Sequence, residues 1–349
     1  MNRQFGALSG LAIIFVVLNH SIHMGTLVPQ QMGLPPVIGP GAVLLVALQQ
    51  LGTYAVPVFL FISGCFAVYS AQNASLWQSY KSIWARLQHI LWPYLIWSVV
   101  FYIVVYIQWG EKYTLPGYIK NLLVGYPFNF VPLLLLFYLL APLLVRIGRN
   151  HGLLLVAALG LYQVVLINLV IPGALGFQFP AWMNFLVPRV VSTTLADWAV
   201  FFPLGIVYSL HARSLVPALR KLAWLLLIAL IALFVLRNIS VNSSALSMPL
   251  VERLAPLPLI GLVPLIKRNQ IPMIEQLERV GRMSYGLYLT HLVVADVVIW
   301  LFEIILPWLL TNQLILEPFL FVLALGIPLG AMYGLTRLPV RSAYHYVFG

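Results

Sequence analysis

Two histidines stand near the end of the first long apolar run of the chain. The run covers residues 8–23, and His20 and His23 are three residues apart within it. On a helix, this spacing places both rings on the same face. An ionisable side chain is costly to bury in a membrane and generally faces a protein interior or a water-filled cavity. We therefore take His20 as the first candidate for a functional residue, with a ring in the lipid headgroups as the alternative.

The two histidine rings are expected at different depths in the membrane. If the helix enters the membrane near Phe5, a rise of about 1.5 Å per residue places His20 roughly 22 Å along the helix axis. This position is in the outer half of a hydrocarbon core that is about 30 Å thick. His23 is nearer to the end of the run, so a position among the headgroups is the better interpretation for it.

A second polar group lies near the C-terminal end of the chain. Ser284, Tyr288 and His291 are spaced as i, i+4 and i+7, which places all three on one stripe of a helix. Hydroxyls and an imidazole on a membrane helix face other helices or water. This stripe is either a part of a functional site or a set of hydrogen bonds between helices.

Asp296 lies farther along the same segment, about 20 Å from its inner end and thus close to the depth of His20. A carboxylate beside a histidine holds one tautomer of the ring and raises its basicity. A contact between Asp296 and His20 is therefore one expectation, although nothing in the sequence decides which helices touch.

The third group is basic and lies on the expected inner side, where Arg86, Arg146 and Arg149 flank apolar segments. Such residues commonly fix membrane topology or contact lipid headgroups. Alternatively, some of them bind the phosphates of a cytoplasmic donor, since the guanidinium fork suits a phosphate group. No glycine-rich phosphate loop, pair of catalytic carboxylates or His/Cys metal cluster accompanies them, and we expect no metal site.

The composition identifies the kind of protein that positions these residues. Of 349 residues, 62% are hydrophobic and 8% are charged, whereas soluble domains have about 25% charged residues. We therefore expect an all-α, polytopic integral membrane protein with one membrane-embedded domain over residues 1–349. The net charge of +11 is scattered between apolar runs, which argues against nucleic acid as a partner. The single cysteine, Cys65, excludes a disulfide within the chain.

The apolar windows predict about ten membrane spans. We place them at 6–28, 50–71, 89–109, 128–146, 152–171, 195–211, 221–238, 249–267, 283–306 and 316–336. The first run is too long for a signal peptide and has no small-residue cleavage pattern, so we expect it to be the first span. With ten spans, fourteen of the nineteen lysines and arginines fall on the side of the N-terminus. Because basic residues favour the cytoplasmic side, we expect both termini to be cytoplasmic.

Three stretches together resemble the acyltransferase-3 family of integral membrane acyltransferases. Residues 8–20 are similar to the opening span of the family, which ends in a histidine. Residues 54–66 are similar to its aromatic stretch with Ser63-Gly64, and Arg86 followed by residues 91–97 continues this similarity. Residues 281–291 are similar to its C-terminal motif. In this order, with ten spans, the motifs cover most of the chain.

The resemblance implies a reaction. A member of this family transfers an acyl group, usually acetyl from acetyl-CoA, to a hydroxyl of a carbohydrate or a lipid-linked glycan. It implies acyl-CoA as a cytoplasmic co-substrate, no bound cofactor, and a place in the cell membrane. It also implies His20 as the general base that takes the proton of the acceptor hydroxyl, with Ser284, Tyr288, His291 and Asp296 as possible supporting groups.

The chain departs from the family pattern at one position. Family members usually have an arginine eleven residues before this histidine, often with an aspartate three residues earlier. Here these positions are Ser9 and Gly6. Either donor binding is rearranged, or the chain is a divergent member with another donor or an altered activity.

A transporter or polysaccharide-export component is the rival interpretation. In that case His20, His291 and Asp296 would line a path for a substrate that crosses the membrane unchanged. The small number of acidic residues and the lack of a visible internal repeat argue against an ion-coupled carrier.

Overall fold

The computed structural model describes residues 3–71, 75–242, 246–337 and 344–349, and all regular structure in them is helical. Seven of the described helices are long and apolar enough to cross a membrane, or eight if the bent pair α7–α8 forms one span. The expected all-α membrane bundle is confirmed. The long helices are α1 (Arg3–Gln31), α2 (Pro40–Gly52) with α3 (Ala55–Ala71), α4 (Leu76–Trp109), α6 (Phe130–Val170), α8 (Phe201–Lys221), α9 (Ala223–Asn242), α13 (Ser284–Ile305) and α15 (Gln313–Arg337).

Shorter helices connect these spans. They are α5 (Leu115–Val124), η1 (Ala181–Leu186), α7 (Ser192–Trp198), α10 (Pro249–Leu254), α11 (Leu257–Leu262), η3 (Val263–Leu265), η4 (Arg268–Gln270), α12 (Ile274–Arg282), α14 (Pro307–Leu310) and α16 (Tyr344–Val347).

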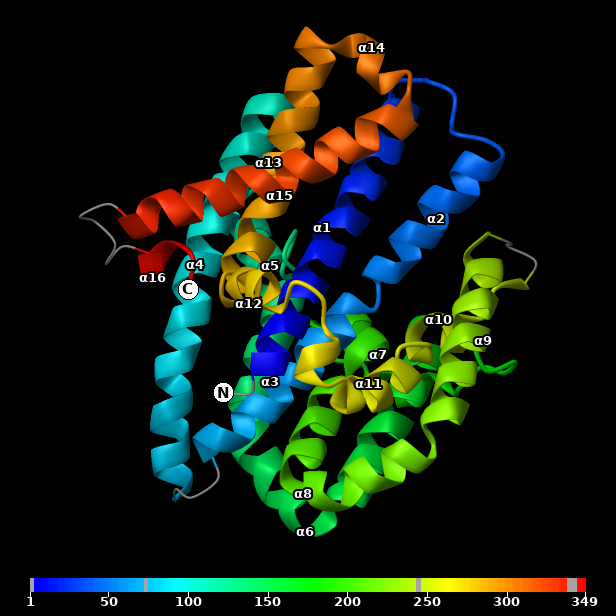
Figure 1. Cartoon of the computed structure of the whole chain (residues 1–349), viewed down its shortest axis with the longest axis vertical. Coiled ribbons are helices and arrows are strands. Elements are labelled where there is room, and N and C mark those ends of the chain that lie inside the picture. Colours follow the sequence, from blue (N-terminus) through cyan, green and yellow to red (C-terminus); the bar gives the residue numbers. More distant parts are fainter. Residues whose placement is uncertain (1–2, 72–74, 243–245, 338–343) are drawn as a thin grey trace.

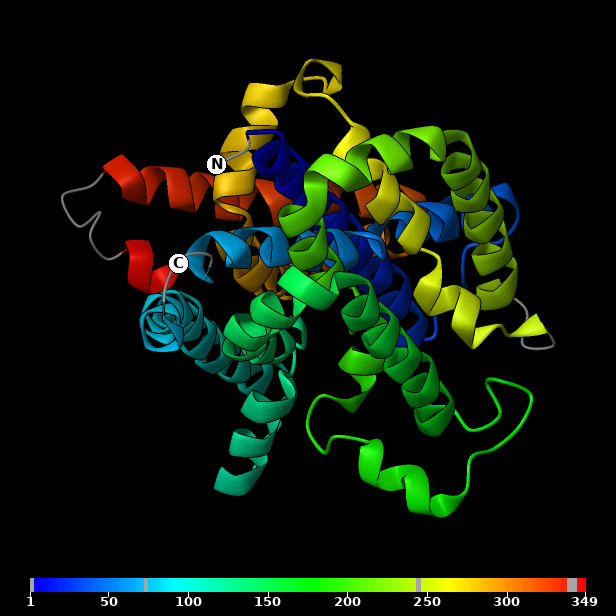
Figure 2. The same ribbon diagram turned by 90° about the horizontal axis from the view of Figure 1, so that it is seen from below.

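Helix α1 runs through the middle of the bundle, with α4 and α9 on opposite sides of it (Figures 1 and 2). Helix α12 packs on its N-terminal half, and α2, α13 and α15 pack along it as well. At the crossing with α12, a Cβ on Gly10 would collide with the backbone of Leu277, and one on Gly281 would collide with the backbone of Gly6. Glycines at these positions let the two helices touch through their backbones. The crossing therefore fixes the position of α1, the helix that carries His20.

Two of the expected spans, 128–146 and 152–171, are parts of the one helix α6. Its backbone leaves the helical region at His151, with φ −129° and ψ 40°, and the helix is kinked there. The expected span at 249–267 is instead divided into α10, α11 and η3. Prolines at 256, 258 and 264 explain the division, because proline lacks the N–H that an uninterrupted helix requires.

Helices α7 and α8 meet at an angle of 44°. Pro203 lies in the first turn of α8 and has no N–H to donate to the carbonyl of Ala199, which its ring also crowds. The fully buried Gln163 of α6 satisfies the backbone at this break. Its amide nitrogen donates to the Asp197 carbonyl at 2.9 Å, and its oxygen accepts from Val200 N–H at 3.0 Å. The break thus holds Asp197 in a fixed place.

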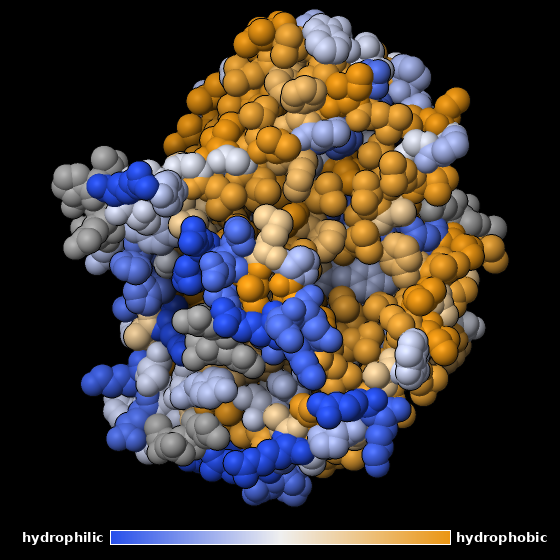
Figure 3. Space-filling view, in the orientation of Figure 1, coloured by the Kyte–Doolittle hydropathy of each residue, from blue (hydrophilic) through white to orange (hydrophobic). Residues whose placement is uncertain are grey.

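The surface agrees with a protein that lies in a bilayer. Hydrophilic residues gather over α12 and around the lower ends of α6 and α8, whereas the upper part of the molecule is largely hydrophobic (Figure 3). Exposed leucine, isoleucine and valine side chains are abundant on α9 and α15. Such an exterior suits a hydrocarbon environment.

Candidate active site

His20 lies in a charged cavity of about 320 Å³ between α1, α7, α9, α10 and α13. Much of the lining is polar, which is unusual for a cavity among membrane helices. The lining residues are Val16, Asn19, His20, Gly52, Thr53, Val56, Asn129, Asp197, Trp198, Arg237, Glu252, Arg253, Pro256 and Tyr288.

The contact between α1 and α2 sets the direction in which His20 points. The Asn19 amide donates to the carbonyl of Gln49 at 2.7 Å. Gly52 has no room for a Cβ, because Asn19 and the Phe15 carbonyl already occupy that space. This close fit fixes the rotation of α1 about its axis. As a result His20 is partly buried and lines the cavity, whereas His23 is exposed.

His291 of α13 is the neighbour of the His20 ring. The two ring centroids are 5.3 Å apart, and His291 is fully buried. Its Nδ1 lies 2.9 Å from the Leu287 carbonyl. A carbonyl oxygen only accepts hydrogen bonds, so Nδ1 carries the proton and Nε2 of the neutral ring has a lone pair. Among the described residues, Nε2 has no hydrogen-bond partner.

Of the two other residues of the predicted polar stripe, one lines the cavity and one does not. Tyr288 lines the cavity, and its ring centroid is 5.9 Å from that of His291. Ser284 is partly buried at the start of α13, one turn earlier, and does not belong to the lining. The structure therefore brings His20, Tyr288 and His291 together and leaves Ser284 outside this group.

An ion-pair network forms the opposite wall of the cavity. Nε of Arg253 in α10 lies 2.8 Å from a carboxylate oxygen of Asp197 in α7, and its Nη1 lies 3.7 Å from Glu252. The Ser240 hydroxyl donates to Glu252 at 2.5 Å. These charged groups were not among the candidates from the sequence. Because they lie within expected apolar spans, the rule that identified His20 could have identified them as well.

Arg237 of α9 is the second arginine in the cavity. Its Nε donates to the side-chain oxygen of the buried Gln50 at 2.7 Å. Its guanidinium carbon lies 5.8 Å from the centroid of the Tyr54 ring, a contact between a cation and an aromatic face. Gln50 and Tyr54 therefore hold this guanidinium in place.

Asp296 lies farther along α13, where its Oδ2 is buried and has no hydrogen-bond partner among the described residues. Burial, and then the charges of Glu111 and Asp296, raise the pKa of the Tyr126 hydroxyl in the loop before α6. In the described part of the chain, no hydrogen bond joins Asp296 to His20.

The basic residues proposed for donor binding lie away from the cavity. Arg86 is partly buried on α4, beside the Tyr138 hydroxyl of α6. Arg146 and Arg149 are exposed where α6 approaches its break. Ser9 is buried, and its hydroxyl donates to the Phe5 carbonyl at 3.0 Å within the same helix. Among the described residues, no group of three or more His, Cys, Asp or Glu side chains is placed to hold a metal ion.

The fold and the cavity together define a helical membrane protein with a histidine in a charged cavity between its helices. The model of the acyltransferase domain, acyltransferase-3, matches residues 4–336. The chain therefore belongs to the acyltransferase-3 family, and the resemblance that the sequence motifs indicated is confirmed. This membership supports acyl transfer in a membrane as the general activity. Neither the curated proteins nor the solved structures include a match to the chain.

Proposed function

We propose that this protein is a membrane O-acyltransferase. It moves an acyl group, most simply acetyl, from cytoplasmic acyl-CoA to a hydroxyl of a cell-surface polysaccharide, glycolipid or related carbohydrate. The observation that carries the proposal is the His20 ring, which lines a charged cavity and contacts the buried His291. A histidine in such a place suits general-base catalysis, the step that acyl transfer to a hydroxyl requires.

In this mechanism His20 takes the proton of the acceptor hydroxyl as the oxygen attacks the thioester carbonyl. The new C–O bond forms and the C–S bond of acyl-CoA breaks. The thiolate leaves with the electron pair of the broken bond and receives the proton from the His20 imidazolium. The reaction is neutral overall, because the proton that His20 takes from the acceptor ends on the CoA thiol.

We assign His291 the role of a positioning residue. Its Nε2, which is unpartnered among the described residues, can accept a hydrogen bond from an N–H of His20, since catalytic hydrogen bonds are often long without substrate and tighten when it binds. Such a bond leaves the other nitrogen of His20 with its lone pair free for the acceptor hydroxyl. Asn129 and Tyr288 line the same cavity and supply polar contacts for the carbohydrate.

His291→Leu is expected to lower kcat by about 10–100-fold, the effect of losing an outer partner that orients a functional histidine. KM for the acceptor should stay nearly constant, because His291 does not touch substrate in this scheme. His291→Gln, which keeps an acceptor oxygen, should recover a part of kcat. Steady-state kinetics of the three proteins test the role, and equal losses in both variants would contradict it.

The membrane topology fits this route for the two substrates. We propose ten spans with both termini in the cytoplasm and the protein in the cell membrane. Arg86, Arg146 and Arg149 then lie on the cytoplasmic side, and we propose that they bind the phosphates of acyl-CoA. His20 lies nearer the opposite side, where a surface carbohydrate is accessible.

The test is a transfer assay with purified protein in a bilayer. We expect label from acetyl-CoA to appear as an ester on an extracted surface glycan, and we expect glycans from cells without the gene to contain fewer acyl groups. A transporter would instead move its substrate across the bilayer with no change in acyl content. Movement without ester formation would refute the proposal.

A further inference from the structure

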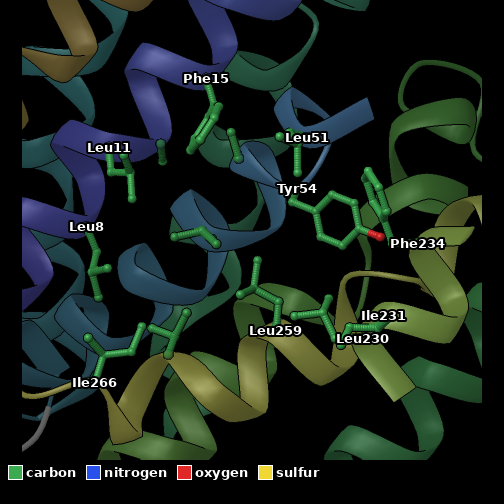
Figure 4. Close-up of a pocket in the computed structure, with 14 residues that line it drawn as sticks. Leu8, Leu11, Phe15, Leu51, Tyr54, Leu230, Ile231, Phe234, Leu259 and Ile266 are labelled. Carbon is green, nitrogen blue, oxygen red and sulfur yellow. The ribbon is translucent and has the colours of Figure 1, made fainter. Parts of the chain in front are cut away.

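An apolar pocket of about 360 Å³ lies beside the His20 cavity, between α1, α3, α9 and α11 (Figure 4). Leu11 and Phe15 of α1, Ile231 of α9 and Leu259 of α11 contribute to its walls. Among the described residues that line this pocket, the hydroxyl of Tyr54 is the only polar side-chain group. Neither the proposed general base nor the ion-pair network uses this pocket.

The pocket opens to the hydrophobic exterior. Leu11 is 37% exposed and Ile231 is 57% exposed, so two of its walls continue into the surface that faces the bilayer. In that environment the adjacent molecules are lipid hydrocarbon chains. A chain can therefore enter the pocket from the side without crossing a polar layer.

The contact between Tyr54 and Arg237 joins the apolar pocket to the charged cavity. Tyr54 lines the pocket, and Arg237, which lies over the Tyr54 ring, lines the cavity of His20. The Nε of Arg237 is bound to Gln50, so its two terminal amino groups are the donors that remain for a ligand. A guanidinium held in this way presents two parallel N–H donors, a geometry that matches a phosphate group.

The direction of the pocket along α1 indicates how a ligand would lie. Leu8 and Phe15 both line the pocket, while Val16, Asn19 and His20 line the cavity. The pocket thus extends roughly 10 Å from the cavity toward the N-terminal end of α1. A lipid would have its head at His20 and its chain toward Leu8. The acyl chain of a donor that enters from the N-terminal side would have the opposite orientation.

From these observations we infer that the acceptor is a lipid: its hydrocarbon chain lies in the apolar pocket, its phosphate binds Arg237, and its hydroxyl-bearing head group reaches His20. The inference rests on the proposed acyl transfer and names the class of acceptor. It also assigns a binding site that can be tested without any acyl transfer.

Photo-crosslinking in nanodiscs tests the site directly. The probe is a long-chain alkyl phosphate with a diazirine on its chain, and the uncharged alkanol of the same length is its control. We expect mass spectrometry to find crosslinks on α9 and α1 at the pocket. Arg237→Gln should reduce crosslinking of the phosphate probe at least tenfold and leave that of the alkanol nearly unchanged.

The chain provides a matched pair of variants for the pocket itself. Ile231→Trp fills the pocket and should abolish crosslinking there, whereas Ile228→Trp places the same side chain at a 63% exposed position of α9 outside the lining. The second variant should behave like the natural protein. Leu51→Trp fills the pocket from α2 and replaces Ile231→Trp if that variant is unstable.

Several results would overturn the inference. They are equal labelling in Ile231→Trp and Ile228→Trp, loss of alkanol labelling in Arg237→Gln, and displacement of the probe by acyl-CoA, which would assign the pocket to the donor. Displacement by inorganic phosphate alone would show an anion site without a lipid. Because these readouts measure binding, they stay separate from a failure of the transfer assay.

Discussion

Replacement of His20 by alanine is expected to abolish acyl transfer while the protein stays folded. General-base catalysis contributes about 10²–10⁴-fold to a rate, so we expect kcat/KM to fall by at least two orders of magnitude. The ring is partly buried at the wall of a cavity, so its removal enlarges that cavity and leaves the packing of α1 against α12 unchanged. Transfer of labelled acetyl groups measures the loss, and size-exclusion chromatography with thermal unfolding measures the fold.

His23 provides the matched control for this experiment. It is the same residue type on the same helix, three positions farther on, and it is exposed. His23→Ala should retain at least half of the activity. His20→Gln, which keeps a polar side chain without a base of similar strength, should be as inactive as the alanine variant. Full transfer by either His20 variant would remove His20 from the mechanism.

Much of this site could be predicted from the sequence because its central residue breaks a strong rule. A histidine within an apolar helix is costly, and that cost is enough to mark His20 as a functional candidate. The same rule applies to Asp197, Arg237 and Arg253. The two arginines lie near the ends of their apolar windows, where a positive charge is interpreted as a topology signal.

The helix contacts could not be predicted. The spacing within residues 284–296 places Tyr288 and His291 on one stripe, but a periodic pattern does not identify the helix that the stripe faces. The structure pairs His291 with His20 through the contact between α1 and α13. The Oδ2 atom of Asp296, which the sequence suggested as a partner of His20, has no hydrogen-bond partner among the described residues. A single sequence specifies which face of a helix is polar but does not specify its neighbour.

The number of spans illustrates a further limit. Apolar windows identify segments that can cross a bilayer, and the composition alone predicts the helical bundle. The local geometry at His151 and at the prolines between 249 and 264 decides whether a window forms one straight helix, a bent helix or several short ones. In this protein the division into short helices affects the site. Because the helix is broken before Leu257, α10 has a direction of its own, and Arg253 on it lines the cavity.

The largest effect outside His20 is expected from the Asp197–Arg253 pair. Removal of one partner from a buried ion pair costs about 3–5 kcal/mol. The side chains of Arg253 and Asp197 are 17% and 25% exposed, so we expect the lower end of this range. Asp197→Leu and Arg253→Leu should each lower the melting temperature measurably and abolish most acyl transfer.

The double variant Asp197→Leu/Arg253→Leu separates stability from function. Apolar replacement of both partners of a buried pair is often neutral or stabilising, so the double variant should recover most of the melting temperature. It should not recover transfer, because the cavity that we propose for the polar acceptor has then lost two of its charges. Recovery of both properties would show that the pair serves the fold alone.

The ion pair between Arg268 and Glu278 is the control for this comparison. Its nearest nitrogen and oxygen atoms are 3.4 Å apart, and Arg268 is 48% exposed. Glu278 is 12% exposed, but the half-exposed Arg268 places this pair closer to exposed pairs, which contribute about 0–1 kcal/mol. Arg268→Leu should therefore lower the melting temperature and the transfer rate less than Arg253→Leu does. The contrast between the two pairs follows from their arginines, because water screens the half-exposed guanidinium of Arg268 and is largely excluded from that of Arg253.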